Sequence, residues 1–101
     1  MSQSYGDYMM EHVRLSVLRL LAEMPTYSAN DSVLTTAVSA LGLSCTRDQM
    51  RGQIAWLKDM RLVTVIEPMA GVSVATLTER GGDIAAGRSS IPGVQRPSPK
   101  A

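Results

Sequence analysis

Apolar residues recur every three or four positions over Gly6–Glu23, the spacing that places them along one face of an α-helix. Asp7 lies in the first turn, where a negative charge interacts favourably with the helix dipole. Pro25 disfavours a helical conformation of the residue before it and so ends the helix, and residues 26–29 are predicted as a connector. The stripe of this long first helix consists of Met10, Val13, Val17, Leu18, Leu20, Leu21 and Met24.

Two more helices are predicted next, with a short turn between them. The second begins at Asn30 or Asp31, either of which can cap a helix, and Gly42 ends it in a left-handed conformation. The third begins with a capping box formed by Thr46 and Gln49. A helix, a tight turn and a helix in succession form a helix-turn-helix unit. The apolar residues expected to face inward are Val33, Leu34, Ala37, Val38, Leu41, Met50, Ile54, Leu57 and Met60.

The pattern then changes to two short runs of β-branched residues, Val63–Glu67 and Val72–Leu77, with the turn Pro68–Gly71 between them. This arrangement predicts a β-hairpin. An isolated two-stranded hairpin is only marginally stable, so this one must pack on the helices. Thr78 can cap a short last helix that continues to Ala86, although two glycines lower its helix propensity.

These elements predict a mainly α domain with a small β-hairpin: a three-helix core, a two-stranded hairpin and a short C-terminal helix, all within residues 1–87. The chain of 101 residues is long enough for one modest hydrophobic core, which makes a single domain the expectation. Residues 88–101 are rich in Pro, Ser and basic residues and show no periodicity, which predicts a flexible tail.

The order of these elements resembles the winged helix-turn-helix domain over roughly residues 8–87. The stretch WLKDMRLVTV followed by ATLTERG is similar to the passage from helix to wing in bacterial winged-helix regulators. The stretches LRLLAEMPTYSANDSVL, TRDQMRGQIAWL and IPGVQRPSP resemble a family of small winged-helix proteins of Mu-like transposable phages and prophages. The resemblance to arsenic-type repressors is one of fold alone, because this chain lacks the cysteine pairs of their metal site.

Charge and composition narrow the classes of function. Ten Lys and Arg against nine Asp and Glu give a net charge of +1, so any contact with DNA must come from local clustering. A single cysteine, Cys45, forms no internal disulfide and no paired-thiol metal site, which favours a reducing compartment. No apolar stretch approaches the roughly 18 residues of a membrane span. We therefore expect a protein of the bacterial host cytoplasm that does not bind membranes.

No motif for catalysis or cofactor binding is present in the sequence. A Gly-rich phosphate loop, a nucleophile elbow, zinc-ligand spacing and a paired-carboxylate arrangement are all missing. His12 has no second ligand at metal-binding spacing. We therefore predict that the protein is not an enzyme and binds neither a metal nor a cofactor.

The winged-helix resemblance implies that the third helix enters the major groove of double-stranded DNA. Arg47, Arg51 and Lys58 follow i, i+4, i+11 spacing and share one helix edge, where guanidinium groups can bind guanine bidentately or contact phosphate. Asp48 and Asp59 on the exposed face favour instead a merely solvated helix. The residues predicted to bind DNA are Ser44, Thr46, Arg47, Arg51, Lys58 and, in the tail, Arg88.

Two hypotheses of different classes remain. The first is a DNA-binding transcriptional regulator of phage or prophage genes. The second is a protein-interaction adaptor in phage DNA processing or packaging, with a phage or host protein as partner. The turn EPMAGVS lacks the Arg and Lys of a DNA-reading wing, which favours the adaptor, whereas the arginine edge favours the regulator. Tyr5, Tyr8, Met9 and Met10 predict a homodimer through terminal helices.

Overall fold

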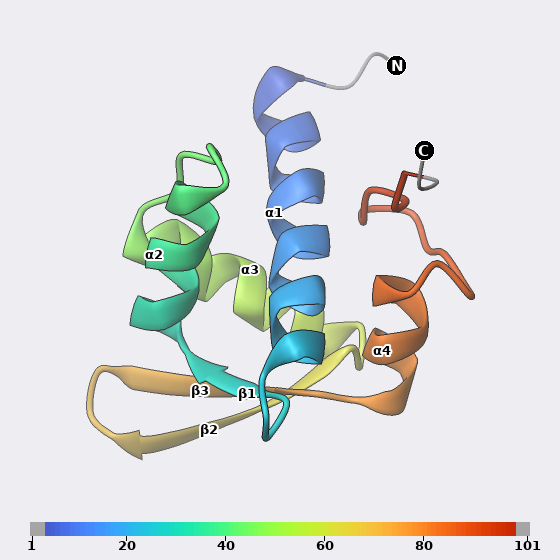
Figure 1. Cartoon of the computed structure of the whole chain (residues 1–101). Coiled ribbons are helices and arrows are strands. Elements are labelled where there is room, and N and C mark those ends of the chain that lie inside the picture. Colours follow the sequence, from blue (N-terminus) through green and yellow to red (C-terminus); the bar gives the residue numbers. More distant parts are fainter. Residues whose placement is uncertain (1–3, 99–101) are drawn as a thin grey trace.

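The structure, a computed structural model, describes residues 4–98, which contain four helices and a three-stranded antiparallel sheet (Figure 1). The elements are α1 (Tyr5–Glu23), β1 (Ser28–Asn30), α2 (Asp31–Ala40), α3 (Arg47–Asp59), β2 (Val63–Met69), β3 (Val72–Leu77) and α4 (Glu79–Ala85). The three-helix core, the hairpin and the short last helix follow in the predicted order. The predicted fold class is confirmed.

Each helix begins at a residue whose side chain accepts a hydrogen bond from a backbone N–H of the first turn. Thr46 and Gln49 form the predicted capping box. Of the two candidates for the cap of α2, Asn30 takes the role, and its Oδ1 accepts from the Val33 N–H at 2.8 Å. The side chain of Asp31 is therefore available for other contacts. The four capping residues are Ser4, Asn30, Thr46 and Thr78.

The sheet has the strand order β1-β3-β2, and both neighbouring pairs are antiparallel. The prediction of a plain connector at residues 26–29 is wrong in part, because Ser28–Asn30 pairs with β3 as strand β1. Tyr27, at a φ of 58°, turns the chain toward the sheet, and its carbonyl accepts from the Leu77 N–H. Three residues are too few to show strand periodicity, so only the tertiary pairing reveals this strand.

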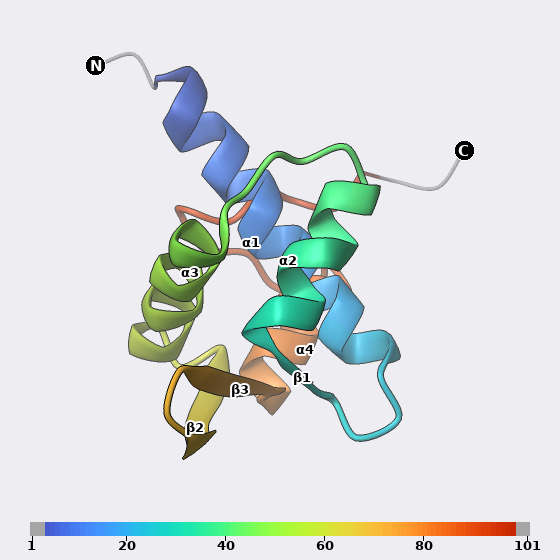
Figure 2. The same ribbon diagram turned by 90° about the vertical axis from the view of Figure 1, so that its left-hand side faces the viewer.

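The core lies where α1 passes between α2 and α4 above the sheet (Figure 1). In the turned view, α3 and the β2–β3 hairpin lie on the same side of the molecule (Figure 2). Two residues predicted to face inward from α2, Val33 and Leu41, are exposed. The buried stripe of α2 is narrower than predicted and consists of Asp31, Leu34 and Val38.

Residues 88–98 form no helix or strand, yet they pack on the domain. Val94 is 5% exposed and belongs to the core. The guanidinium of Arg14 lies 4.1 Å from the ring centroid of Trp56, and its Nη1 donates to the Gly93 carbonyl at 2.8 Å. Residues 88–98 of the predicted flexible tail are therefore packed on the domain and are not an extension in solvent. The remainder, with Lys100, lies outside the described residues.

Candidate nucleic-acid interface

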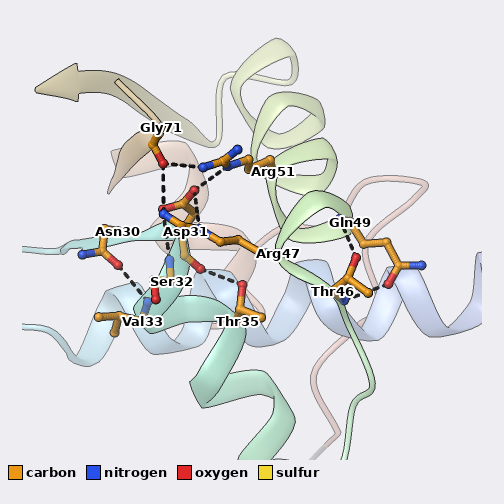
Figure 3. A network of polar contacts seen from close by, with 10 residues as sticks. All are labelled: Asn30, Asp31, Ser32, Val33, Thr35, Thr46, Arg47, Gln49, Arg51 and Gly71. Atoms are coloured by element: carbon orange, nitrogen blue, oxygen red, sulfur yellow. Dashed lines mark hydrogen bonds and ion pairs between the residues drawn. The ribbon is translucent and has the colours of Figure 1, made fainter. Parts of the chain in front are cut away.

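The carboxylate of Asp31 is completely buried where the start of α2 meets α3 and the turn of the hairpin (Figure 3). Its Oδ1 accepts from the Ser32 N–H at 3.0 Å and from Arg47 Nη2 at 3.2 Å. Its Oδ2 accepts from Arg51 Nε at 2.7 Å and from Arg47 Nε at 3.3 Å. Four donors thus satisfy both oxygens, as a buried carboxylate requires.

Two opposing effects determine the pKa of Asp31. Burial favours the neutral acid and raises the pKa, whereas the hydrogen bonds from Arg51 and Arg47 and their positive charges lower it. The arginines prevail, and the pKa falls from 3.8 to about 2. Asp31 is therefore an anion at neutral pH and holds two cations beside it.

Arg47 and Arg51, which we call the arginine pair, also contact the hairpin turn. The Nη2 groups of both residues donate to the carbonyl oxygen of Gly71, from Arg47 at 2.9 Å. Gly71 has a φ of 81°, a left-handed conformation that glycine adopts without strain. The pair therefore joins α2 and α3 to the turn of the β2–β3 hairpin around Gly71, which we call the wing tip. Its side chains are nevertheless 46% and 38% exposed, so solvent or a ligand can reach them.

The other residues predicted to bind DNA lie in separate places. Ser44 is exposed in the loop before α3, Thr46 caps α3, and Lys58 is exposed in the last turn of α3. Arg88 donates to Asp83 at 2.9 Å and lines a groove of about 490 Å³ between α1 and α4. The structure thus brings Arg47 and Arg51 together, whereas Arg88 lies in the groove between α1 and α4.

The side of α3 that points away from the core is acidic. The buried residues Met50, Ile54 and Leu57 define its inward side. At the opposite side lie four exposed residues with i, i+4, i+7, i+11 spacing, here called the acidic ridge: Asp48, Gly52, Ala55 and Asp59. The arginine pair lies at the flank of α3, between this ridge and the core. The wing, residues 63–77, adds no cation beside the pair, because it contains neither Lys nor Arg and exposes Ile66, Glu67 and Met69.

Asp31 is the member of this cluster that the sequence analysis missed, since it was considered only as a helix cap. Its spacing contains a signal that could have identified it. Asp31 stands i−3 from Leu34 and i−7 from Val38, on the apolar stripe of α2. A carboxylate on a core-facing stripe needs a cationic partner, and the next helix offers two arginines, Arg47 and Arg51.

Three further questions concern the thiol of Cys45, groups of side chains that could hold a metal ion, and helices that could span a membrane. Burial raises the pKa of the Cys45 thiol, which favours its protonated form. Within residues 4–98, no cluster of three or more His, Cys, Asp and Glu side chains is arranged to hold a metal ion. No helix in the same range is both long and apolar enough to cross a bilayer.

Comparison with known sequences assigns the chain to a family. The uncharacterized protein gp26 of Escherichia phage Mu is 45% identical over 96 residues, which cover 95% of this chain and 98% of gp26. The chain belongs to the gp26 family. An uncharacterized protein of Haemophilus influenzae is 32% identical to this gp26-family protein over 77 residues, covering 76% of this chain and 74% of that protein. No family model matches the chain.

Comparison with solved structures confirms the fold of this gp26-family protein. The structure of hsRosR-S1, a winged-helix regulator, superposes with a TM-score of 0.62 at 16% identity. The match covers 72% of this chain and 63% of the other, so this chain spans less than two thirds of the length of hsRosR-S1. The predicted winged-helix fold and kinship with Mu-like phage proteins are thus confirmed. At such low identity the likeness concerns the fold alone.

Proposed function

We propose that this gp26-family protein binds double-stranded DNA with the arginine pair and the adjoining wing tip, as a regulator of phage genes. The observation that carries the proposal is the pair itself, two partly exposed arginine side chains whose guanidinium groups are held by a buried carboxylate. Oriented guanidinium groups suit phosphate and base edges. The winged-helix fold shared with a DNA-binding regulator supports it. The protein would act as a binding protein, not as an enzyme, in the bacterial cytoplasm where phage DNA lies.

The charges around α3 determine how DNA can approach. Asp48 and Asp59 on the acidic ridge would repel phosphates if α3 entered the groove with that ridge foremost. DNA must therefore meet the flank that carries the arginine pair. Because the net charge of the protein is only +1 and the arginine pair supplies two cations, binding is expected to be weak, with a shallow log–log salt slope of roughly −1.8.

The proposal is tested by replacing one arginine while keeping the carboxylate paired. Arg47→Gln removes one donor group, and Arg51 still neutralises Asp31 through its 2.7 Å bond. The expected result is a loss of about fivefold in affinity for a short duplex, measured by fluorescence anisotropy. Arg80→Gln removes the same charge from an exposed position on α4 and serves as the matched control. Equal affinities of the two variants would contradict the proposal.

The proposal includes a homodimer formed through the terminal helices. The first turns of α1 carry Tyr5 and Tyr8, which are 79% and 46% exposed, and this end of α1 projects beyond the core (Figure 1). Burying such aromatic surface against a second copy would stabilise a two-fold dimer. Sedimentation as a monomer at high micromolar concentration would exclude it.

The adaptor function is the second candidate, and the acidic ridge is the observation that favours it. A protein partner with basic groups could bind Asp48 and Asp59, with the exposed Ile66 and Met69 of the wing as apolar contacts. The double substitution Asp48→Asn with Asp59→Asn separates the two functions. It should abolish capture of the partner if the protein is an adaptor, and strengthen DNA binding if the protein is a regulator.

A further inference from the structure

We infer that the arginine pair contacts a backbone phosphate of DNA rather than guanine, and that a phosphate oxygen takes the position now occupied by the Gly71 carbonyl oxygen. This inference rests on the proposed DNA binding and specifies its ligand group. From their spacing alone, Arg47 and Arg51 could contact either guanine or phosphate, and the inference chooses phosphate.

The directions of the donors in the arginine pair favour phosphate over guanine. Recognition of guanine requires two N–H groups from one edge of a guanidinium. In both arginines the Nε group is bonded to Asp31 and one Nη2 hydrogen is bonded to the Gly71 carbonyl. With the Nε edges held by Asp31, a bidentate contact to guanine would have to use the Nη1–Nη2 edge of a single arginine, whereas the Nη2 groups of the two arginines converge on one common point. Release of the Nε groups would leave the buried carboxylate of Asp31 without its cationic partners, which is strongly destabilising, so these groups stay with Asp31.

The position of the Gly71 oxygen shows where an anion would be held. The Nη2 groups of two cations converge on this one oxygen. A phosphate oxygen in the same place would form charge-assisted hydrogen bonds, which are roughly twice as strong as those to a neutral carbonyl. Gly71 lies in an exposed turn, so water can solvate its carbonyl after displacement. The exchange therefore favours phosphate and moves the wing tip away from α3.

Two carboxylates oppose this exchange and limit its strength. Besides the hydrogen bond that Arg51 donates to Asp31, the charges of Asp48 and Glu67 raise the pKa of Arg51. Each would also repel a phosphate at the Gly71 position. Glu67 is exposed on the wing, so it can be neutralised without a packing defect. Removal of its charge should therefore strengthen DNA binding.

The experiment compares affinities for three duplexes of equal length, one of A·T pairs only, one of G·C pairs only and one mixed, over a range of salt concentrations. Arg47→Gln should weaken binding by about the same fivefold factor on all three and reduce the log–log salt slope by roughly 0.9. Glu67→Gln should strengthen binding about threefold on all three. Arg80→Gln and Glu23→Gln are the matched controls for each change of charge, at exposed sites away from the pair.

A second measurement follows the wing tip directly. Amide hydrogen exchange at Gly71 and Val72 should become faster when wild-type protein is saturated with the A·T duplex, because the turn loses its contact with α3. A loss for Arg47→Gln that is confined to duplexes with G·C pairs, or slower exchange at the wing tip, would overturn the inference and leave DNA binding intact. Failure of the wild type to bind any duplex would overturn both.

Discussion

Asp31 and the arginine pair show which residue properties the sequence reveals and which it conceals. The i, i+4 spacing of Arg47 and Arg51 on a capped helix was enough to predict that they share an edge. The partner that fixes them was not predicted, because Asn30 and Asp31 are equivalent caps in the sequence and only the fold assigns the cap to Asn30. That choice leaves Asp31 to organise the interface.

At this scale, the first prediction concerns the loss of the buried charge. Asp31→Asn keeps the size of the side chain but removes the negative charge that pairs with Arg47 and Arg51. It also places the NH2 group of the amide, a hydrogen-bond donor, against other donors. The free energy of unfolding should fall by about 2 kcal/mol in urea titrations at neutral pH. Asp48→Asn, at an exposed position of the acidic ridge, should change it by less than about 0.5 kcal/mol. Similar values for the two variants would show that the cluster does not stabilise the fold.

The second prediction concerns pH. The pKa of Asp31 is about 2 in the folded protein against 3.8 in the unfolded chain, so the unfolded state binds this proton more readily. The stabilisation is therefore complete above about pH 4 and is lost as the pH falls toward about 2. Urea titrations between these values should show a steeper loss for the wild type than for Asp31→Asn. Parallel curves would mean that the carboxylate is not held by the arginines.

At the scale of elements, local signals sufficed for every helix and for the hairpin, because caps, breakers and periodicity act within a few residues. Thr46 with Gln49, Gly42 and Thr78 took the predicted roles. Strand β1 and the packed segment around Val94 depend on partners far away in the sequence. Such partners leave no local pattern, so neither feature could be predicted from the sequence.

Close packing of α4 on the loop before β2 leads to the third prediction. A Cβ atom at Gly81 would lie 2.1 Å from the carbonyl oxygen of Leu62, which is fixed by a hydrogen bond from the Thr78 N–H. Gly81→Ala should therefore destabilise the protein by about 3 kcal/mol or more. Gly82→Ala, whose nearest contact would be an ordinary 3.8 Å, should be neutral or stabilise it by up to about 1 kcal/mol. Thermal unfolding of both variants checks the difference.

The docked segment around Gly93 leads to the fourth prediction. A Cβ at Gly93 would lie 2.6 Å from the Trp56 ring, and a φ of 96° disfavours any side chain there. Gly93→Ala should release the segment from Arg14 and Trp56, shift the tryptophan emission to longer wavelength and increase cleavage by proteases after Gly87. The control is Gly52→Ala, where a Cβ would meet nothing within 4 Å. Unchanged emission would contradict the role of this contact.

At the scale of the whole molecule, residues 4–98 form a winged helix in which the surface around the arginine pair carries both positive and negative charge. The acidic ridge and Glu67 lie on both sides of the arginine pair, so a small electropositive flank is bounded by negative charge. The fold class was predictable because a superfamily is defined by the order of its elements. The orientation of the arginine pair was not predictable, because it depends on how α2, α3 and the wing meet.

The most direct test of the central claim is a map of backbone amide chemical shifts as a short DNA duplex is titrated into the 101-residue chain. The account predicts that the largest shifts fall at residues 44–51 and at the wing tip around Gly71, and that they are lost at high salt. Shifts concentrated in the groove between α1 and α4, or none at a DNA concentration in large excess, would contradict it.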